Sequence, residues 1–373
     1  MSAMESPDLP SARERVEGRI ARLLRLLPGR WLLRLIGEQP LSLHGHVLDA
    51  HVQFILASRR RKPQHQLCEP TVVAGRQRYR REIQAVSESA GVRPTRIQSV
   101  QNLMIDGADG PLAARHYAPP ASSTLPPKPM LVFLHGGGFV LGDLDTHDEP
   151  CRLLCHHGDM HVLSVAYRLA PEHPFPAPID DACASVRWAQ AHAADFGADP
   201  ARVCVGGDSA GGNLSVVASL TLAHENRAPA AQLLIYPATD FEATTPSRNL
   251  FASGFILTVG DMDIFESHYL GDRALALRRD PRSSPVRSTA LATSPPTLVT
   301  TAEFDPLRDE GETFADALRA AGVDVRLVRM RGLPHGYLHM TTIVPAAESA
   351  MIETAKAFRG LLDDRASRRS NPD

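Results

Sequence analysis

A serine flanked by glycines is the first group in this sequence that could do chemistry. Residues 207–211 read Gly-Asp-Ser-Ala-Gly, and they stand between a β-rich segment (202–206) and a helical one that begins at Gly211. A serine displayed on a tight strand-to-helix turn takes strained backbone angles, so the positions two before and two after it must lack bulk. Gly207 and Gly211 meet that demand, and the start of the next helix favours negative charge nearby. The pattern predicts a nucleophile at Ser209.

The competing interpretation of this turn is a glycine-rich loop that binds phosphate. Gly207 and Gly212 have the Walker spacing, but Asn213 follows where a lysine is needed. Asp208 would also repel a phosphate, and no Gly-x-Gly-x-x-Gly fingerprint occurs here. The strand–turn–helix context therefore favours the nucleophile.

A run of three glycines, residues 136–138, follows His135 and an apolar segment at 130–134. Glycines bring bare backbone N–H groups to a ligand, because no Cβ stands in the way. In acyl transfer such amides meet the oxyanion of the tetrahedral intermediate, and losing one donor costs ~2.7–4 kcal/mol of barrier. A flexible loop is the alternative, but ordering three glycines is costly unless close backbone approach is needed.

A serine nucleophile needs a base, and the base needs an acid to orient it. Two β-rich segments, 297–301 and 323–330, run into loops that contain Asp305 and His335. The order Ser209, Asp305, His335 along the chain is the order expected of an α/β-hydrolase.

Other side chains compete for these two roles. Glu303 and Asp309 are alternative acids, and His339 is an alternative base one helical turn from His335. His335 is favoured because it stands between a proline and a glycine in the expected loop.

The elements that must position these groups alternate between strand-like and helix-like patterns after residue 100. Apolar runs typical of strands buried on both faces occur at 130–134, 161–166, 203–205, 232–235 and 297–300. Helical candidates lie between or after them at 145–157, 179–194, 210–224 and 309–320. This alternation predicts an α/β fold with a mostly parallel sheet and helices on both faces.

Helical periodicity dominates residues 1–95. One predicted face collects apolar residues, and most of the arginines nearby lie off it; the apolar residues are Val16, Ile20, Leu23, Leu24 and Leu27. Such a helix normally packs on the rest of the protein or on a second subunit, which is the interpretation that we favour. The alternative is a helix on a membrane surface, with arginines at the headgroups and Trp31 as an anchor. The basic run 59–62 is interpreted as a solvated helix end.

Composition excludes several classes of function. The 373 residues carry a formal net charge of -2, which gives no global reason to bind nucleic acid or an anionic membrane. The longest stretches without a charged residue, 209–224 and 332–347, contain polar residues, so we expect no membrane span. Five cysteines without dense spacing argue for reduced thiols, and the N-terminus does not resemble a signal peptide. We expect a cytoplasmic protein.

A metal site is the alternative interpretation of one further cluster, Cys151, Cys155, His156 and His157. Cys151 and Cys155 share one helical face, but no second ligand pair at zinc-finger spacing follows. A buried helix with small apolar thiols is therefore favoured, and we expect neither a metal nor a cofactor.

Taken together, four motifs resemble the hormone-sensitive-lipase-type (bacterial family IV) carboxylesterases of the α/β-hydrolase superfamily. They are His-Gly-Gly-Gly-Phe at 135–139, the segment 167–177, Gly-Asp-Ser-Ala-Gly-Gly at 207–212, and Asp-Pro-Leu-Arg-Asp at 305–309 with Pro334-His335. The resemblance covers about residues 48–362. Roughly the first 40 residues exceed what the family leads us to expect.

The resemblance implies a set of roles and a domain plan. It implies Ser209 as nucleophile, Asp305 as acid, His335 as base, and an oxyanion hole from the amides of Gly137, Gly138 and Ala210. The implied catalytic domain is 96–365, with a helical cap from an N-terminal part (1–95) and a second segment (241–285), and a polar tail at 366–373. Segment 167–177 is interpreted as structural.

The expected function is that of a serine carboxylesterase or lipase-like hydrolase, which forms an acyl-enzyme on short- to medium-chain acyl esters. One alternative is a non-catalytic ligand-binding homologue, which would show itself by the loss of a triad member. The other is an amidase or peptidase with the same triad. The expected partner is a small ester; a homo-oligomer or peripheral membrane contact by the N-terminal helix stays open, and no nucleic acid is expected.

Overall fold

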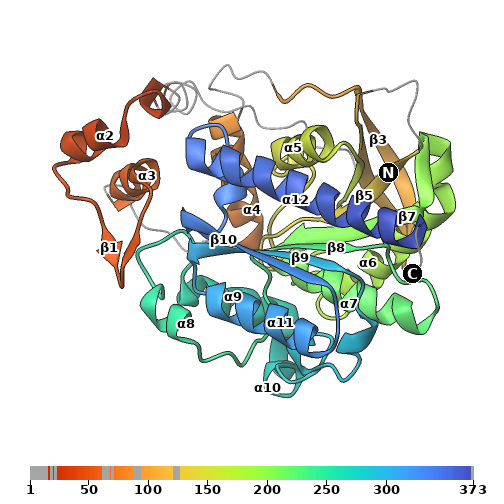
Figure 1. Ribbon diagram of the computed structural model, residues 1–373. Coiled ribbons are helices and arrows are strands. Elements are labelled where there is room, and N and C mark those ends of the chain that lie inside the picture. Colours follow the sequence, from red (N-terminus) through yellow and green to blue (C-terminus); the bar gives the residue numbers. More distant parts are fainter. Residues whose placement is uncertain are drawn as a thin grey trace.

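A central sheet of eight strands organises the part of the chain that this computed structural model describes, namely residues 16, 20, 23–60, 68, 71–87, 94–120 and 127–370 (Figure 1). The strand order is β10-β9-β8-β7-β5-β6-β4-β3. The strands are β3 (Ser99–Gly107), β4 (Gly110–Ala118), β5 (Lys128–Leu134), β6 (His161–Val165), β7 (Ala198–Asp208), β8 (Gln232–Ile235), β9 (Thr297–Phe304) and β10 (Val325–Pro334). Strands β5 to β10 pair in parallel, whereas β3 and β4 form an antiparallel hairpin that joins β6. The expected mostly parallel sheet is confirmed.

The core strands are apolar without alternation because helices cover both faces of the sheet. Every residue of β6, β8 and β9 is buried. The hairpin of β3 and β4 differs, since most of β3 is exposed and its pattern is weak. The sequence therefore indicated only a β-rich region there.

Two helices cover one face of the sheet and three cover the other (Figure 1). The first pair is α5 (Asp148–Gly158) and α12 (Pro345–Ser370); the second group is α6 (Ala177–His192), α7 (Ala210–His224) and α11 (Arg308–Ala320). Side chains of β5 alternate between the two cores, with Phe133 beneath the first pair and Val132 beneath the second group. Helix α12 reaches Ser370, so most of the segment expected as a polar tail is helical.

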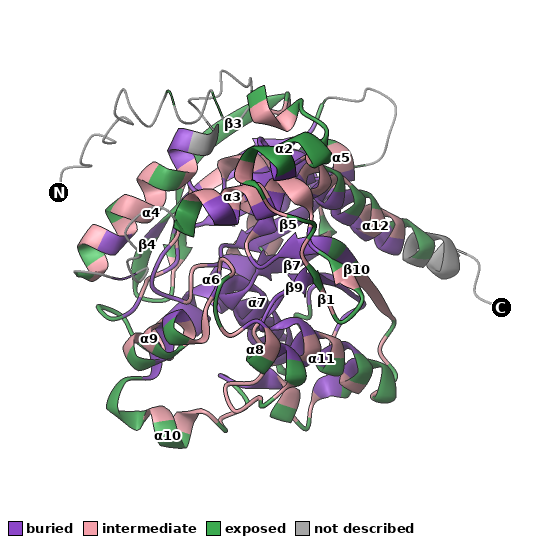
Figure 2. Ribbon diagram, turned by 90° about the vertical axis from the view of Figure 1, so that its left-hand side faces the viewer, coloured by how far each residue is buried: buried purple, intermediate pink, exposed green. Residues whose placement is uncertain are grey.

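The remaining described elements are helices outside these two layers, a small hairpin and single 3-10 turns. The N-terminal part contains α2 (Gly29–Ile36), β1 (Ser42–Leu43), β2 (His46–Val47), α3 (Ala50–Arg60) and α4 (Val72–Ser87). After β8 come α8 (Pro246–Leu250), α9 (Val259–Leu270) and α10 (Ala274–Leu277). Single 3-10 turns are η1 (Ala193–Phe196), η2 (Gly271–Arg273), η3 (Pro285–Arg287), η4 (Leu291–Thr293) and η5 (Tyr337–Met340). Figure 2 shows α2, α3, α4, α8 and α9 on one side of the molecule.

Helix α9 begins at a capping box. The Thr258 hydroxyl accepts the amide of Asp261, and the Asp261 carboxylate accepts the amide of Thr258. This reciprocal pair satisfies two amides that would otherwise lack partners at the helix start. It fixes the direction of a helix that reaches the site described below.

None of the described helices is long and apolar enough to cross a membrane.

Candidate active site

Ser209 lies on the turn between β7 and α7, in a strained conformation. Its φ and ψ are 54° and -116°, a region that non-glycine residues rarely adopt. Its amide donates to the carbonyl of Ile235 at 2.9 Å, which ties the turn to the neighbouring strand. A Cβ on Gly207 or Gly211 would lie 2.1 or 1.8 Å from the carbonyl oxygen of Leu134. The close approach of β5 therefore requires the two flanking glycines.

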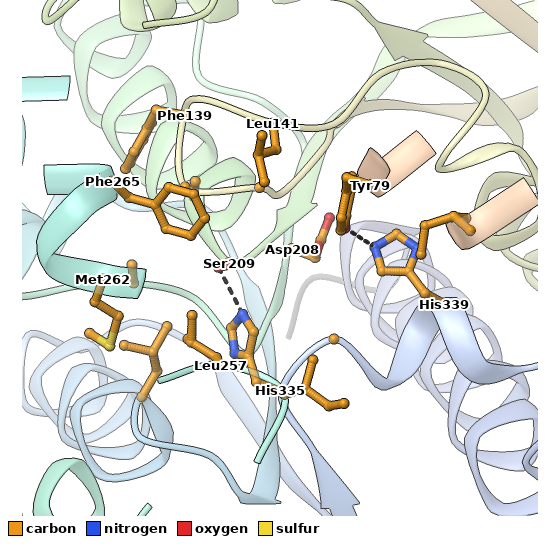
Figure 3. Close-up of a pocket in the computed structure, with 18 of the residues that line it drawn as sticks. Tyr79, Phe139, Leu141, Asp208, Ser209, Leu257, Met262, Phe265, His335 and His339 are labelled. Atoms are coloured by element: carbon orange, nitrogen blue, oxygen red, sulfur yellow. Dashed lines mark hydrogen bonds between the residues drawn. The ribbon is translucent and has the colours of Figure 1, made fainter. Parts of the chain in front are cut away.

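His335 lies between Ser209 and Asp305. Figure 3 shows its hydrogen bond with Ser209. Its Nε2 is 3.0 Å from the Ser209 Oγ, and its Nδ1 is 2.7 Å from the Asp305 Oδ2. Asp305 follows β9, is fully buried, and accepts the amide of Leu307 through its other oxygen. The parallel strands β7, β9 and β10 end at one edge of the sheet, which brings the three side chains together. The arrangement can move a proton from the serine to the imidazole.

The competing acids and base are engaged elsewhere. The Glu303 carboxylate lies 2.8 Å from His46 Nδ1 and also accepts the amide of residue 332. Asp309 pairs with the adjacent arginine. His339 Nε2 lies 2.8 Å from the Tyr79 hydroxyl of α4. None of these three groups takes a place in the hydrogen-bonded line from Ser209.

Three small residues, Gly137, Gly138 and Ala210, line the same cavity as Ser209. None of the three donates a hydrogen bond to another residue that the structure describes. The two glycines have φ values of 112° and 62°, and a Cβ on Gly138 would lie 2.2 Å from the ring of Phe265. Figure 3 shows that ring beside Ser209. Unpaired amides beside a serine hydroxyl are suited to bind an oxygen that gains negative charge.

Asp208 holds the glycine loop in place. Its Oδ1 accepts the amide of Gly136 at 2.8 Å and lies 3.2 Å from His147 Nε2. Burial alone would raise the pKa of the Asp208 carboxyl, but His147, His339 and the Gly136 amide together lower it to about 2. The carboxylate is therefore ionised at any ordinary pH.

The group of His147, Asp208 and His339 also has the residue types of a metal site. One ligand atom from each lies within 4.8 Å of the others. Burial, followed by His147, lowers the pKa of His339 to about 3, so its imidazole is neutral. Sequence analysis missed this group, because His147 carries no local motif and meets Asp208 only through the fold.

The segment 167–177 supports the glycine loop from behind. The Tyr167 hydroxyl donates to the carbonyl of His135 at 2.6 Å, and the two rings stack with centroids 4.4 Å apart. The amide of Ala170 donates to the carbonyl of Phe139. These contacts agree with the interpretation of the segment as structural.

Residues from the N-terminal helices and from the helices that follow β8 line the cavity around Ser209. Its volume is about 220 Å³, and its walls come from α3, α4, the region of α8 and α9, and the loops after β5, β7, β8, β9 and β10. Most of the walls are apolar. Figure 3 labels five of the apolar side chains, which are Phe139, Leu141, Leu257, Met262 and Phe265, and Phe241 also lines the cavity. The cavity is therefore apolar, with the reactive groups at its base.

Glu310 is a second fully buried carboxyl in the wall of this cavity, beside Asp208. Its Oε1 accepts the amides of Thr239 and Asp240, while its Oε2 has no partner. Burial raises the pKa of Glu310 to about 8. Sequence analysis did not single out this residue, because its burial depends on packing between α11 and the loop after β8.

All five cysteines are described, free and buried. Burial raises the pKa of the Cys155 thiol to about 12, and it raises that of Cys151 as well. These thiols are thus packed as small apolar groups and are poor thiolate ligands at neutral pH.

The chain is similar to several proteins that are named as ester hydrolases. A family model described as the alpha/beta hydrolase fold matches residues 131–339. The chain is 44% identical over 325 residues to the carboxylic ester hydrolase LipN of Mycobacterium tuberculosis, covering 85% of this chain and 84% of that protein. It is 36% identical over 263 residues to ethyl acetate hydrolase of Pseudomonas putida, covering 70% and 82%. The solved structure of the ester hydrolase EH1AB1 from the metagenome of Lake Arreo, bound to a bipyridine phosphonate derivative, has a TM-score of 0.75 and 36% identity, covering 90% of this chain and 98% of that one.

Proposed function

Because this chain belongs to the hormone-sensitive-lipase-type carboxylesterases of the α/β-hydrolase fold and is a carboxylic ester hydrolase, we propose that it cleaves esters through Ser209, His335 and Asp305. The observation that carries this proposal is the hydrogen-bonded line in which His335 lies 3.0 Å from the serine and 2.7 Å from the aspartate.

The first half of the reaction forms an acyl-enzyme. His335 Nε2 takes the proton of Ser209 as Oγ attacks the acyl carbon, and Asp305 orients the imidazole and stabilises its positive charge. The same proton then passes from Nε2 to the leaving alcohol. In the second half, His335 takes a proton from water as the water oxygen attacks the acyl carbon. It then returns that proton to Ser209 Oγ as the bond between Oγ and the acyl carbon breaks, which releases the carboxylic acid and the free serine.

The amides of Gly137, Gly138 and Ala210 would bind the oxyanion of both tetrahedral intermediates. Their support is that the three residues line the cavity and that their amides are unpaired among the described residues. Asp208 and Tyr167 hold the loop from the other side, so the donors need no rearrangement when charge develops.

The substrate is a short- to medium-chain acyl ester in this proposal. A cavity of about 220 Å³ with apolar walls suits a small acyl group better than a long one. The same proposal assigns the cap to residues 1–95 and 241–285, because α3, α4, α8 and α9 supply walls of the cavity. A series of p-nitrophenyl esters of increasing acyl length measures this preference.

The comparison of two serine variants tests the assignment. Ser209→Ala should lower kcat for a p-nitrophenyl ester by about a millionfold. Ser215→Ala is the matched control, because this serine follows six residues later, inside α7, and its hydroxyl donates to the carbonyl of Gly211 in the same helix. Near-normal turnover by folded Ser209→Ala contradicts the assignment.

The same triad could cleave amides, so an amidase or peptidase is the second candidate. Matched ester and anilide substrates distinguish the two, and we expect faster turnover of the ester. A binding protein without catalysis is disfavoured because all three triad side chains are present and in contact.

We also propose a cytoplasmic location, supported by five free, buried thiols in a chain of 373 residues. Subcellular fractionation measures it directly.

A further inference from the structure

Exposed apolar side chains gather in the N-terminal part of the molecule. Of the twelve large apolar residues that are exposed in the described chain, seven lie between residues 16 and 35. They are Val16, Ile20, Leu23, Leu26, Leu27, Trp31 and Leu35, and we name this set the N-terminal apolar face. Leu26 is 77% exposed and Leu23 is 66% exposed. Single exposed apolar residues are ordinary, but a group of this kind marks an interaction site.

This segment is bound to the rest of the protein through a charged residue. The Arg25 guanidinium donates to the carbonyls of Thr341 and Thr342 at 3.0 and 3.2 Å and pairs with the Glu348 carboxylate. The neighbouring Leu26 points its apolar side chain to solvent instead. A segment that only covers the core would bury the apolar residue and expose the charged one.

Helix α2 is anchored as well. Leu32 and Leu33 are buried, and a Cβ on Gly29 would lie 2.7 Å from that of Ala50 at the start of α3. On the outer side, Trp31 and Leu35 lie one turn apart and are 48% and 63% exposed. Figure 2 shows α2 at the outer surface. The packing that sequence analysis favoured for this region therefore accounts for only part of its apolar residues.

The exposed side of α2 is also basic. Arg30 and Arg34 are exposed, α2 contains no acidic residue, and neither arginine forms an ion pair with a described residue. The Arg34 guanidinium lies 5.0 Å above the Trp31 ring. Exposed tryptophan and leucine beside arginine are the composition of a helix that lies in a membrane interface.

We propose that the N-terminal apolar face binds the surface of a membrane that contains anionic lipids. A second copy of the chain fits less well. A symmetric dimer through this face brings Arg30 and Arg34 of α2 close to the same residues of the copy, where like charges repel. Lipid phosphates complement both arginines, because basic residues are attracted to the negative surface potential of an anionic membrane.

Membrane binding would bring lipid close to the cavity. Helix α3 packs directly on α2, and its residues Ile55 and Arg59 line the cavity around Ser209. Esters that partition into membranes would reach the cavity from this side. This consequence rests on the proposed function, whereas the binding itself does not.

Flotation of the full-length protein with lipid vesicles tests the proposal. We expect the protein to float with vesicles of phosphatidylcholine and phosphatidylglycerol, and to stay at the bottom with phosphatidylcholine alone. The double variant Trp31→Glu with Leu35→Glu should lose at least about tenfold in partitioning, because two anchors become charged. The matched control is Val100→Glu with Met104→Glu, on the exposed strand β3.

The outcomes separate binding from catalysis. Hydrolysis of a water-soluble p-nitrophenyl ester should be unchanged in both double variants, which shows that they are folded, and Ser209→Ala should float like the wild type. The proposal is overturned if the wild type does not float with anionic vesicles, or if both double variants lose binding equally. It is also overturned if light scattering shows a dimer that only the Trp31→Glu, Leu35→Glu variant dissociates, without vesicle binding.

Discussion

Gly137→Ala isolates the contribution of the glycine loop to catalysis. The residue has a φ of 112°, and an added Cβ would lie 2.3 Å from the carbonyl oxygen of Leu141 and 2.6 Å from its carbon. Both are backbone atoms, so no rotation of a side chain relieves the clash. The loop is held by Asp208 and Tyr167 on its other side, so the amides of Gly137 and Gly138 must move. Losing one such donor costs ~2.7–4 kcal/mol, or about 10²–10³ in kcat.

The measurement is steady-state hydrolysis of p-nitrophenyl acetate together with urea unfolding. We expect kcat to fall and KM to change little, because the donors bind charge that exists only in the transition state. Gly322→Ala is the control, since this glycine also has a positive φ (84°) but nothing within 4 Å of an added Cβ. It should lose ~1–2 kcal/mol of stability and keep its turnover. A folded Gly137→Ala protein with kcat within about threefold of the wild type refutes the reasoning.

Three further variants test other parts of the site. Asp305→Asn should lower kcat by about 10⁴ while the protein stays folded, because the imidazole loses its orienting acid; steady-state rates at pH 7 check this, and a loss below tenfold contradicts it. Glu310 has a pKa raised from 4.5 to about 8, so the folded protein holds this proton more tightly than the unfolded chain. The protonated Glu310 contributes its full stabilisation below pH 4.5, and this contribution is lost as pH rises through 8. The loss in unfolding free energy is at most ~5 kcal/mol relative to Glu310→Gln. That variant does not titrate, and it retains the oxygen that accepts the Thr239 amide. Unfolding free energies of both proteins across this range measure the difference, and parallel curves contradict it. Tyr79→Phe removes the 2.8 Å contact with His339 and should cost ~1 kcal/mol of stability, with kcat within about threefold; thermal unfolding detects it, and an unchanged stability argues against the contact.

Local patterns were enough to predict the elements that end near the site. The serine turn could be predicted because β5 approaches it so closely that Gly207 and Gly211 leave no room for a side chain. The strand at 232–235 and the helix at 210–224 have the predicted bounds, since buried strands and buried helices carry strong apolar patterns.

Contacts between distant segments could not be predicted in the same way. Asp208 meets Gly136 and His147 only because β5 and β7 are neighbours in the sheet. Glu310 becomes buried by packing between α11 and a loop, and its sequence position alone resembles a solvated helix start. The outward side chains of α2 likewise depend on the anchor of Arg25, which joins residues from opposite ends of the chain.

Labelling with a fluorophosphonate tests the central claim most directly, because only an activated serine reacts with it at an appreciable rate. We expect one equivalent of phosphonyl group per chain, located on Ser209 by peptide mass spectrometry, and parallel loss of ester hydrolysis. His335→Ala should abolish the labelling, whereas Ser215→Ala should not. Modification at a different serine, or full esterase activity in a protein labelled at Ser209, would contradict the account.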